Sequence, residues 1–167
     1  MRMDRTGRLL VLCGALSALL PAVRAMAAVD AFLTVTGSKQ GPIKGEAVGG
    51  QIHLSAVVHS TATATGATAG RRMHSTITIT KEIDRASPSF AQALASNETM
   101  SQVVITFQGG SGAGAGKVAQ KIVLSDATIT AIRKSGNTEQ ITFEYQTIEV
   151  TYKGGGKTAI DDWTAPS

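Results

Sequence analysis

The chain has 167 residues, a formal net charge of +4 and one cysteine, Cys13. A single cysteine excludes an intramolecular disulfide and any metal site built on several thiolates. Only 4% of the residues are aromatic, so few large side chains are present to offset the roughly 1 to 2 kcal/mol of backbone entropy lost per ordered residue. Joining copies of the chain would bury further surface, and the composition therefore favours oligomerisation.

The first 27 residues have the pattern of a signal peptide. Three arginines come first, at Arg2, Arg5 and Arg8. An apolar run from Leu9 to Leu20 follows, and Ala25-Met26-Ala27 has the small-x-small pattern of a cleavage site. The run is shorter than the roughly 20 residues that a membrane-spanning helix needs. We expect cleavage after Ala27, a secreted product without stable membrane association, and a single domain over residues 28–167.

Two alternatives to this leader remain open. Cys13 lies in a weak lipoprotein box, because Leu12 stands where a small residue is required. Met26 resembles an ordinary start, in which case the product would stay in the cytoplasm until it is exported. The leader holds four arginines and one aspartate, so without it the formal charge falls from +4 to about +1 and nucleic-acid binding loses its main support.

The first half of the remaining chain predicts strands separated by loops. Val29 to Thr36 alternates and ends at Gly37, residues 37–50 form a loop, and Gln51 to Val58 alternates again. Ser60 to Gly70 is STATATGATAG, an uncharged stretch without large side chains, which predicts an exposed loop. A further strand is expected from about Met73, with Ile77 and Ile79 facing the core and threonines between them.

A short helix and a strand follow. Ser87-Pro88 predicts a helix start with Ser87 as the cap. The expected buried helix face is Phe90, Ala91, Leu94 and Ala95. Ser96-Asn97 ends the helix, and Gln102 to Phe107 then alternates with Val103, Ile105 and Phe107 on one face.

The second half predicts long strands that change face. After the flexible glycine-rich stretch 109–116, apolar residues from Val118 to Leu124 and from Ala127 to Ala131 have opposite parity, which predicts a bulge at Ser125-Asp126. Residues 135–137 form a turn, and Ile141 to Tyr152 switches face near Gln146-Thr147. Such strands are typical of curled sheets. The sequence predicts a mainly β fold, an antiparallel β barrel or two packed sheets with one short α-helix, before a glycine-rich tail.

The residues give little support for catalysis or metal binding. His53 and His59 on one strand would stand about 20 Å apart, and His74 lies beyond the loop. The carboxylate pairs, Glu144 with Glu149 and Asp161 with Asp162, lack a nucleophile or triad motif beside them. The sequence therefore predicts no enzyme, no cofactor and no metal site.

The run TKEIDRASPSFAQAL, Thr80 to Leu94, resembles the signature of the Hcp family, the haemolysin-coregulated tube proteins of type VI secretion systems. Ala28 to Gly37, Ile141 to Tyr152 and Asp162-Trp163 are similar to the family's first strand, last long strand and C-terminal end. The resemblance implies hexameric rings that stack into a tube for effector export. The implied partners are further copies of the chain, secreted effectors, and spike and sheath proteins.

The resemblance also implies that the loop after the second strand reaches the neighbouring ring. Stacking or subunit contacts are then expected at Thr61, Thr63, Thr65, Arg71, Arg72 and Trp163. Arg71 and Arg72 would pair with Glu46 or Asp126 of an adjacent subunit, the alternative being plain surface charge, and Trp163 would dock on its own or another subunit. A threonine-rich face would line a wet lumen or be an ordinary solvated face; its members are Thr76, Thr78, Thr80, Thr128, Thr130 and Thr142.

The leader departs from the family pattern, since Hcp tubes assemble in the cytoplasm. This departure keeps two other classes open. One is an exported Hcp-like protein that forms extracellular rings or filaments, as an adhesin or structural protein. The other is a ligand-binding β barrel, which would be a monomer with an apolar interior cavity.

Overall fold

The computed structural model describes residues 30–60, 76–109, 117–152 and 157–162. The strands are β1 (Asp30–Gly37), β2 (Gly41–Ile43), β3 (Ile52–Leu54), β4 (Ala56–Ser60), β5 (Thr76–Glu82), β6 (Thr99–Gln108), β7 (Val118–Ser135), β8 (Thr138–Glu144), β9 (Thr147–Tyr152) and β10 (Lys157–Asp162). The helices are α1 (Ser87–Ala95) and the 3₁₀ turn η1 (Val48–Gly50). No helix in these ranges has the length and apolar character needed to cross a membrane.

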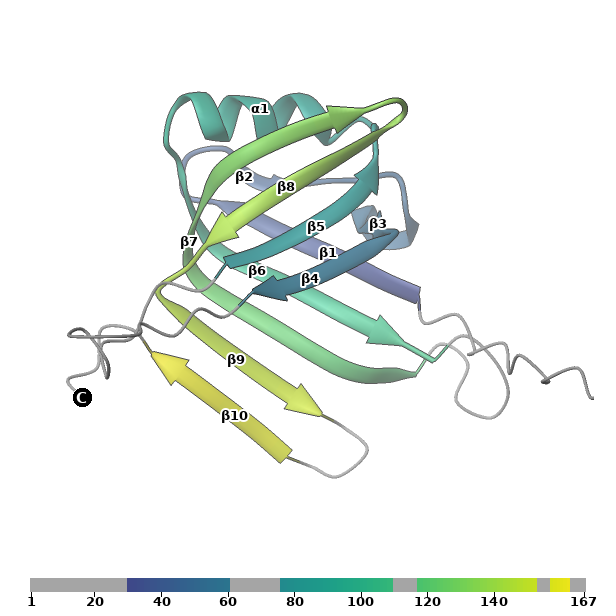
Figure 1. The fold of residues 1–167 in the computed structure, drawn as a ribbon, viewed down its shortest axis with the longest axis vertical. Coiled ribbons are helices and arrows are strands. Elements are labelled where there is room, and N and C mark those ends of the chain that lie inside the picture. Colours follow the sequence, from purple (N-terminus) through teal and green to yellow (C-terminus); the bar gives the residue numbers. More distant parts are fainter. Residues whose placement is uncertain (1–29, 61–75, 110–116, 153–156, 163–167) are drawn as a thin grey trace, which may run out of the picture.

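The strands form one antiparallel sheet that curls into a barrel, with α1 across one end (Figure 1). The strand order is β2-β1-β6-β7-β8-β5-β4, while β3 also pairs with β1 and β9 pairs with both β7 and β10. Ser55 alone separates β3 from β4, although β3 pairs with β1 and β4 with β5. Ser55 therefore links β4, at one end of the strand path, to β3, which pairs with β1 near the other end. The prediction of an antiparallel barrel with one short helix is confirmed.

The core lies inside the curled sheet and consists mostly of aliphatic side chains. Leu33 on β1, Ile79 on β5 and Ile105 on β6 are fully buried, and Phe90 of α1 and Phe143 of β8 supply the largest rings. The alternation that predicted strands over Val29–Thr36, Met73–Thr80 and Gln102–Phe107 corresponds to β1, β5 and β6; for the second of these, the described part begins at Thr76.

The predicted bend in β7 is present at Asp126. Leu124 and Ala127 are both buried despite their opposite parity, because Asp126 between them has a left-handed φ of +51°. At this point β7 also changes partner along one edge, from β9 to β8. The two-residue turn that joins β7 to β8 contains Gly136, whose φ of +57° suits glycine.

The prediction of one strand over Gln51–Val58 is wrong. The Ser55 N–H and hydroxyl both donate to the Thr80 carbonyl, which marks the crossing from β3 to β4. The alternation that places even-numbered side chains in the core ends at this crossing: Ile52 and Leu54 lie in the core, whereas Val58 is exposed. Alternation does not reveal such a crossing, since each half is a correct strand by itself.

The predicted helix position is right, but its buried face is rotated. α1 buries Ser87, Phe90 and Ala93, whereas Ala91 and Ala95 are exposed and Leu94 packs only partly against the core. Ser87 does not cap the helix, because its hydroxyl is engaged inside the protein.

Three predictions about loops and the last strand also need correction. The loop over residues 37–50 contains β2 and η1. The strand predicted over Ile141–Tyr152 is divided into β8 and β9 at Tyr145-Gln146, close to the predicted change of face. The tail contains β10, which forms a hairpin with β9 (Figure 1).

Candidate functional site

The family-like signature of the sequence folds into a buried polar cluster at the start of α1. The Lys81 ammonium donates to the Asp84 carboxylate at 2.7 Å, to the Glu139 carboxylate at 3.0 Å and to the Glu82 carbonyl at 2.6 Å. It also lies within hydrogen-bond distance of the Ser87 hydroxyl, at 3.2 Å, so its three protons are shared among four acceptors. The Ser87 hydroxyl donates to the same Glu139 oxygen at 2.6 Å and accepts from the Asp84 N–H. The cluster thus fixes the first turn of α1 to β5 and β8.

The cluster is a structural device rather than an exposed reactive site. Lys81 is 1% exposed and Glu139 1% exposed, and Lys81 also lies 6.0 Å from the centre of the Phe90 ring. Within the described part of the chain, the second carboxylate oxygen of Glu139 is buried without a hydrogen-bond partner. Removing one member of such a cluster would leave a buried charge without its partner, which is strongly destabilising.

A second buried carboxylate, Glu98, lies just after α1 and organises the turn between β1 and β2. It accepts the backbone N–H groups of Lys39 and Gln40 at 2.7 and 2.8 Å and the Gln40 side-chain amide at 2.8 Å. These bonds, led by the backbone N–H of Gln40, hold the pKa of Glu98 below its usual value. No sequence pattern singled out Glu98.

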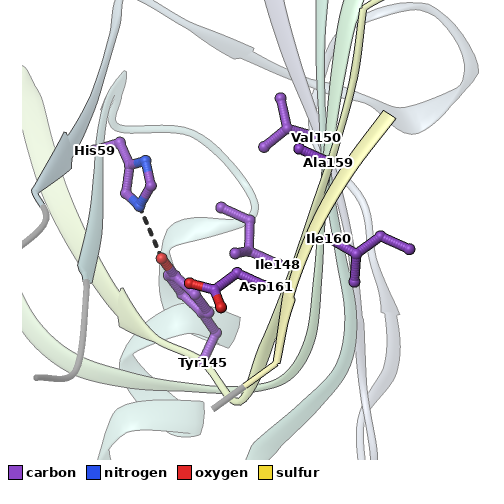
Figure 2. Close-up of a pocket in the computed structure, with 7 residues that line it drawn as sticks. All are labelled: His59, Tyr145, Ile148, Val150, Ala159, Ile160 and Asp161. Atoms are coloured by element: carbon purple, nitrogen blue, oxygen red, sulfur yellow. Dashed lines mark hydrogen bonds between the residues drawn. The ribbon is translucent and has the colours of Figure 1, made fainter. Parts of the chain in front are cut away.

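A pocket of about 170 Å³ opens on the side of the barrel, between β4 and the β9–β10 hairpin (Figure 2). The residues that line it are His59, Tyr145, Ile148, Val150, Ala159, Ile160 and Asp161. His59 Nε2 and the Tyr145 hydroxyl lie 2.8 Å apart at its edge. Figure 2 shows the Asp161 carboxylate turned towards Tyr145, whereas Ile160 points away. The pocket thus has a polar side and an aliphatic floor.

The structure brings the predicted threonines together on the outer face of the barrel. In the β5–β8 register, Thr78 is opposite Thr142, and their hydroxyl oxygens lie 3.0 Å apart. Thr76 is opposite Glu144, and Thr128 of β7 lies on the far side of the same Glu144. Thr130 is exposed and the others are partly buried, so the face is polar and accessible.

The residues predicted to make stacking or subunit contacts lie outside the described residues: Thr61, Thr63, Thr65, Arg71, Arg72 and Trp163. Their suggested partners, Glu46 and Asp126, are exposed. His74 is also outside, while His53 lies 3.9 Å from Asp30. In the described ranges, no group of three or more His, Cys, Asp or Glu side chains is arranged to hold a metal ion.

The arrangement of the fold agrees with the comparison to known families. A family model described as "Type VI secretion system effector, Hcp" matches residues 32–152, from β1 to the end of β9. The chain belongs to the Hcp family. The resemblance noted in the sequence is confirmed, and this Hcp chain is a protein of the type VI secretion class.

Individual relatives extend the match beyond the family model. The chain is 30% identical over 168 residues to the "Major exported protein" of Pseudomonas aeruginosa, covering 83% of this chain and 98% of that protein. The structure of the secreted protein Hcp3 from Pseudomonas aeruginosa is 28% identical, with a TM-score of 0.71 and coverage of 83% of this chain and 100% of that one.

A third relative supports the fold alone. The structure of a mutant of the Hcp1 protein from E. coli EAEC 042 has a TM-score of 0.74 at 24% identity and covers 81% of this chain and 99% of that one. The curled sheet with one helix is therefore the Hcp fold.

Proposed function

We propose that this Hcp chain is a structural subunit of a type VI secretion tube. Copies of it form hexameric rings, and the rings stack into a tube for the export of effectors, beside spike and sheath proteins. The observation that carries the proposal is the match to the Hcp family from β1 to β9, in a chain that covers nearly the whole length of its relatives.

The unpaired strand edges supply surfaces for ring formation. In the described part of the chain, β4 pairs only with β5 and β10 pairs only with β9. An open edge presents unpaired backbone N–H and C=O groups, which can pair with a strand of another subunit. Val58 on β4 and Ile160 on β10 are 55% and 67% exposed, so both edge strands also carry apolar surface.

The polar outer face suits a lumen. The Thr78–Thr142 pair and its neighbours place hydroxyl groups on an accessible face of β5, β7 and β8, and a wet channel requires such a surface. The proposed role is mechanical, without catalysis, cofactor or nucleic acid.

Ring-to-ring contacts are assigned to the segment after β4. Thr61, Thr63, Thr65, Arg71 and Arg72 would contact the next ring or subunit, with the exposed Glu46 or Asp126 as partners for the arginines. Six equivalent contacts engage together, so even about 1 kcal/mol each would sum to roughly 6 kcal/mol gross per ring. Weak contacts of this kind allow a tube to assemble and to be shed.

The proposed organisation includes a leader over residues 1–27 and a single domain over residues 28–167. Mass spectrometry of the mature N-terminus tests it: a start at Ala28 supports cleavage, a start at Met26 supports the cytoplasmic alternative, and a longer product contradicts both. If Ala28 is the start, an exported protein that forms rings or filaments outside the cell becomes the competing function.

Negative-stain electron microscopy, combined with light scattering of the purified protein, tests the tube proposal. The expected result is a six-fold ring and a mass of about six subunits, with stacks at high protein concentration. A folded monomer at every salt and protein concentration would contradict it, and fibres without rings would support the filament alternative instead.

A further inference from the structure

The pocket beside β10 is a gap in the barrel wall. In the adjoining part of β7 and β9 the core-facing side of the sheet is buried, as at Leu124 and Ile148, which are 0% and 5% exposed. On the β9–β10 hairpin the same side is uncovered: Val150 is only partly buried and Ala159 is exposed. The pocket of about 170 Å³ occupies this place. An apolar, core-facing surface has thus been left open next to the C-terminal end of the described chain.

The strand register shows which residues of β10 face this gap. Val150 is opposite Ala159, and Ile148 is opposite Asp161. Val150 and Ile148 are in turn opposite Ile122 and Leu124 of β7, whose side chains lie in the core. Ala159 and Asp161 therefore belong to the core-facing parity of β10. Trp163 is two positions after Asp161 and so has the same parity in the sequence.

We propose that the segment after β10 docks the indole of Trp163 in this pocket of its own chain, against the aliphatic side chains that line it. Trp163 follows Asp161, which lines the pocket, by two residues, and two residues of extended chain span at most about 7 Å.

The size and chemistry of the pocket suit an indole. An apolar cavity of about 150 Å³ accepts a benzene ring, and the pocket here is about 170 Å³ and open on one side. Ile148 and Val150 offer aliphatic contacts, and Tyr145 offers a ring. A buried indole N–H usually finds an acceptor, and oxygens of Tyr145 and Asp161 lie on the polar side of the pocket. The proposal concerns a single subunit and does not depend on ring assembly.

Trp163 is the only tryptophan, so the fluorescence of the full chain reports on it directly. The expected result is an emission maximum at shorter wavelength than in urea-unfolded protein, and a severalfold smaller acrylamide quenching constant. Both should be independent of dilution to the monomer. Exposed, readily quenched emission from the folded protein would overturn the proposal, and so would protection that disappears on dilution, since the indole would then be held by another copy.

A matched pair of variants locates the indole. Ala159→Arg places a long side chain in the pocket and should shift the emission to longer wavelength with a severalfold rise in quenching. Thr158→Arg, at the adjacent exposed position on the opposite face, should leave both unchanged. If both variants fold and both keep the emission maximum and the quenching constant of the original protein, the indole does not dock at this site.

A measurement on the unaltered protein covers the case in which Ala159→Arg does not fold. Nuclear Overhauser contacts are expected between the indole protons and the methyl groups of Ile148 and Val150. Contacts only with other methyl groups, or none in the folded protein, would overturn the assignment.

Discussion

Lys81 on β5 and Glu139 on β8 are directly opposite each other across two antiparallel strands, with Lys81 Nζ 3.0 Å from Glu139 Oε1. Both occupy core positions of their strands, next to Ile79 and Ile141, yet both carry a charge. The pair joins the signature segment before α1 to β8, at a separation of 58 residues along the chain. It is therefore central to how the helix is placed on the barrel.

Lys81→Met is expected to lower the free energy of unfolding by about 3 to 5 kcal/mol, because it leaves Glu139 and Asp84 buried without their cation. Urea unfolding followed by circular dichroism measures this. Protein concentration must be held fixed, since assembly would contribute to apparent stability.

The exposed Lys117 supplies the control for that substitution. Lys117→Met should change the free energy of unfolding by no more than about 0.5 kcal/mol. The double variant Lys81→Met, Glu139→Met should recover much of the loss, because no unpaired charge remains at position 139. A Lys81→Met variant as stable as Lys117→Met would refute the role given to the pair.

Glu98 predicts a dependence of stability on pH. Its pKa is lowered in the folded state, chiefly by the Gln40 backbone N–H, so the ionised form stabilises the fold. The contribution is complete above the unfolded-state pKa, close to the ordinary glutamate value of 4.5, and is lost as the pH falls through the lower folded-state pKa. Glu98→Gln should therefore be most destabilising near neutral pH, with a difference from the original protein that narrows in acid.

Urea unfolding over a series of pH values measures this difference. Gln40→Ala provides a graded comparison, because it removes the side-chain donor to Glu98 and keeps the backbone N–H. Its acid dependence should lie between those of the original protein and Glu98→Gln. If the gap between the original protein and Glu98→Gln stays constant with pH, the assignment to Glu98 is wrong.

Gly37 is predicted to be intolerant of a side chain for a steric reason. A Cβ built at Gly37 would overlap Glu98 Oε1, which is held in place by Lys39 and Gln40. Gly37→Ala should cost about 1 to 3 kcal/mol of stability, as overpacking typically does. Because the clash is with one side chain, the same substitution in a Glu98→Ala background should cost clearly less. Equal costs in the two backgrounds would show that the clash is not the cause.

Much of the fold was predictable because alternation reports which strand face is buried. It located β1, β5, β6 and the bend of β7 at Asp126. It could not show that the chain leaves one strand pair for another at Ser55, since a strand's partner is not encoded in its own alternation. β10 was missed because its central residues, Thr158 to Asp161, alternate only weakly and lie on a hairpin whose inner face is open.

The sequence contains a pattern from which the buried Lys81–Glu139 pair could have been predicted. Lys81 continues the core parity of Ile77 and Ile79, and Glu139 has the core parity of Ile141 and Phe143. Opposite charges at core positions of two strands predict a buried pair, but only when the strands are known to be neighbours. Glu98 has no comparable signal, because its donors, two backbone N–H groups and one side-chain amide, belong to a turn 58 to 59 residues away.

The last prediction tests where the subunits of the proposed ring meet. If the open edges of β4 and β10 form the contact, their exposed apolar residues Val58 and Ile160 become buried on assembly. The double variant Val58→Lys, Ile160→Lys places two like charges there. It should keep the circular dichroism spectrum of the original protein but elute as a smaller species in size-exclusion chromatography with light scattering.

Val48→Lys is the matched control for the edge variant. Val48 is 93% exposed but lies on η1, outside both open edges, so its variant should assemble as the original protein does. If the double variant forms rings as well as the original protein does, the contact lies elsewhere. The tube proposal itself is then tested only by the electron microscopy described above. Loss of rings in Val48→Lys alone would instead move the interface to the turn between β2 and β3.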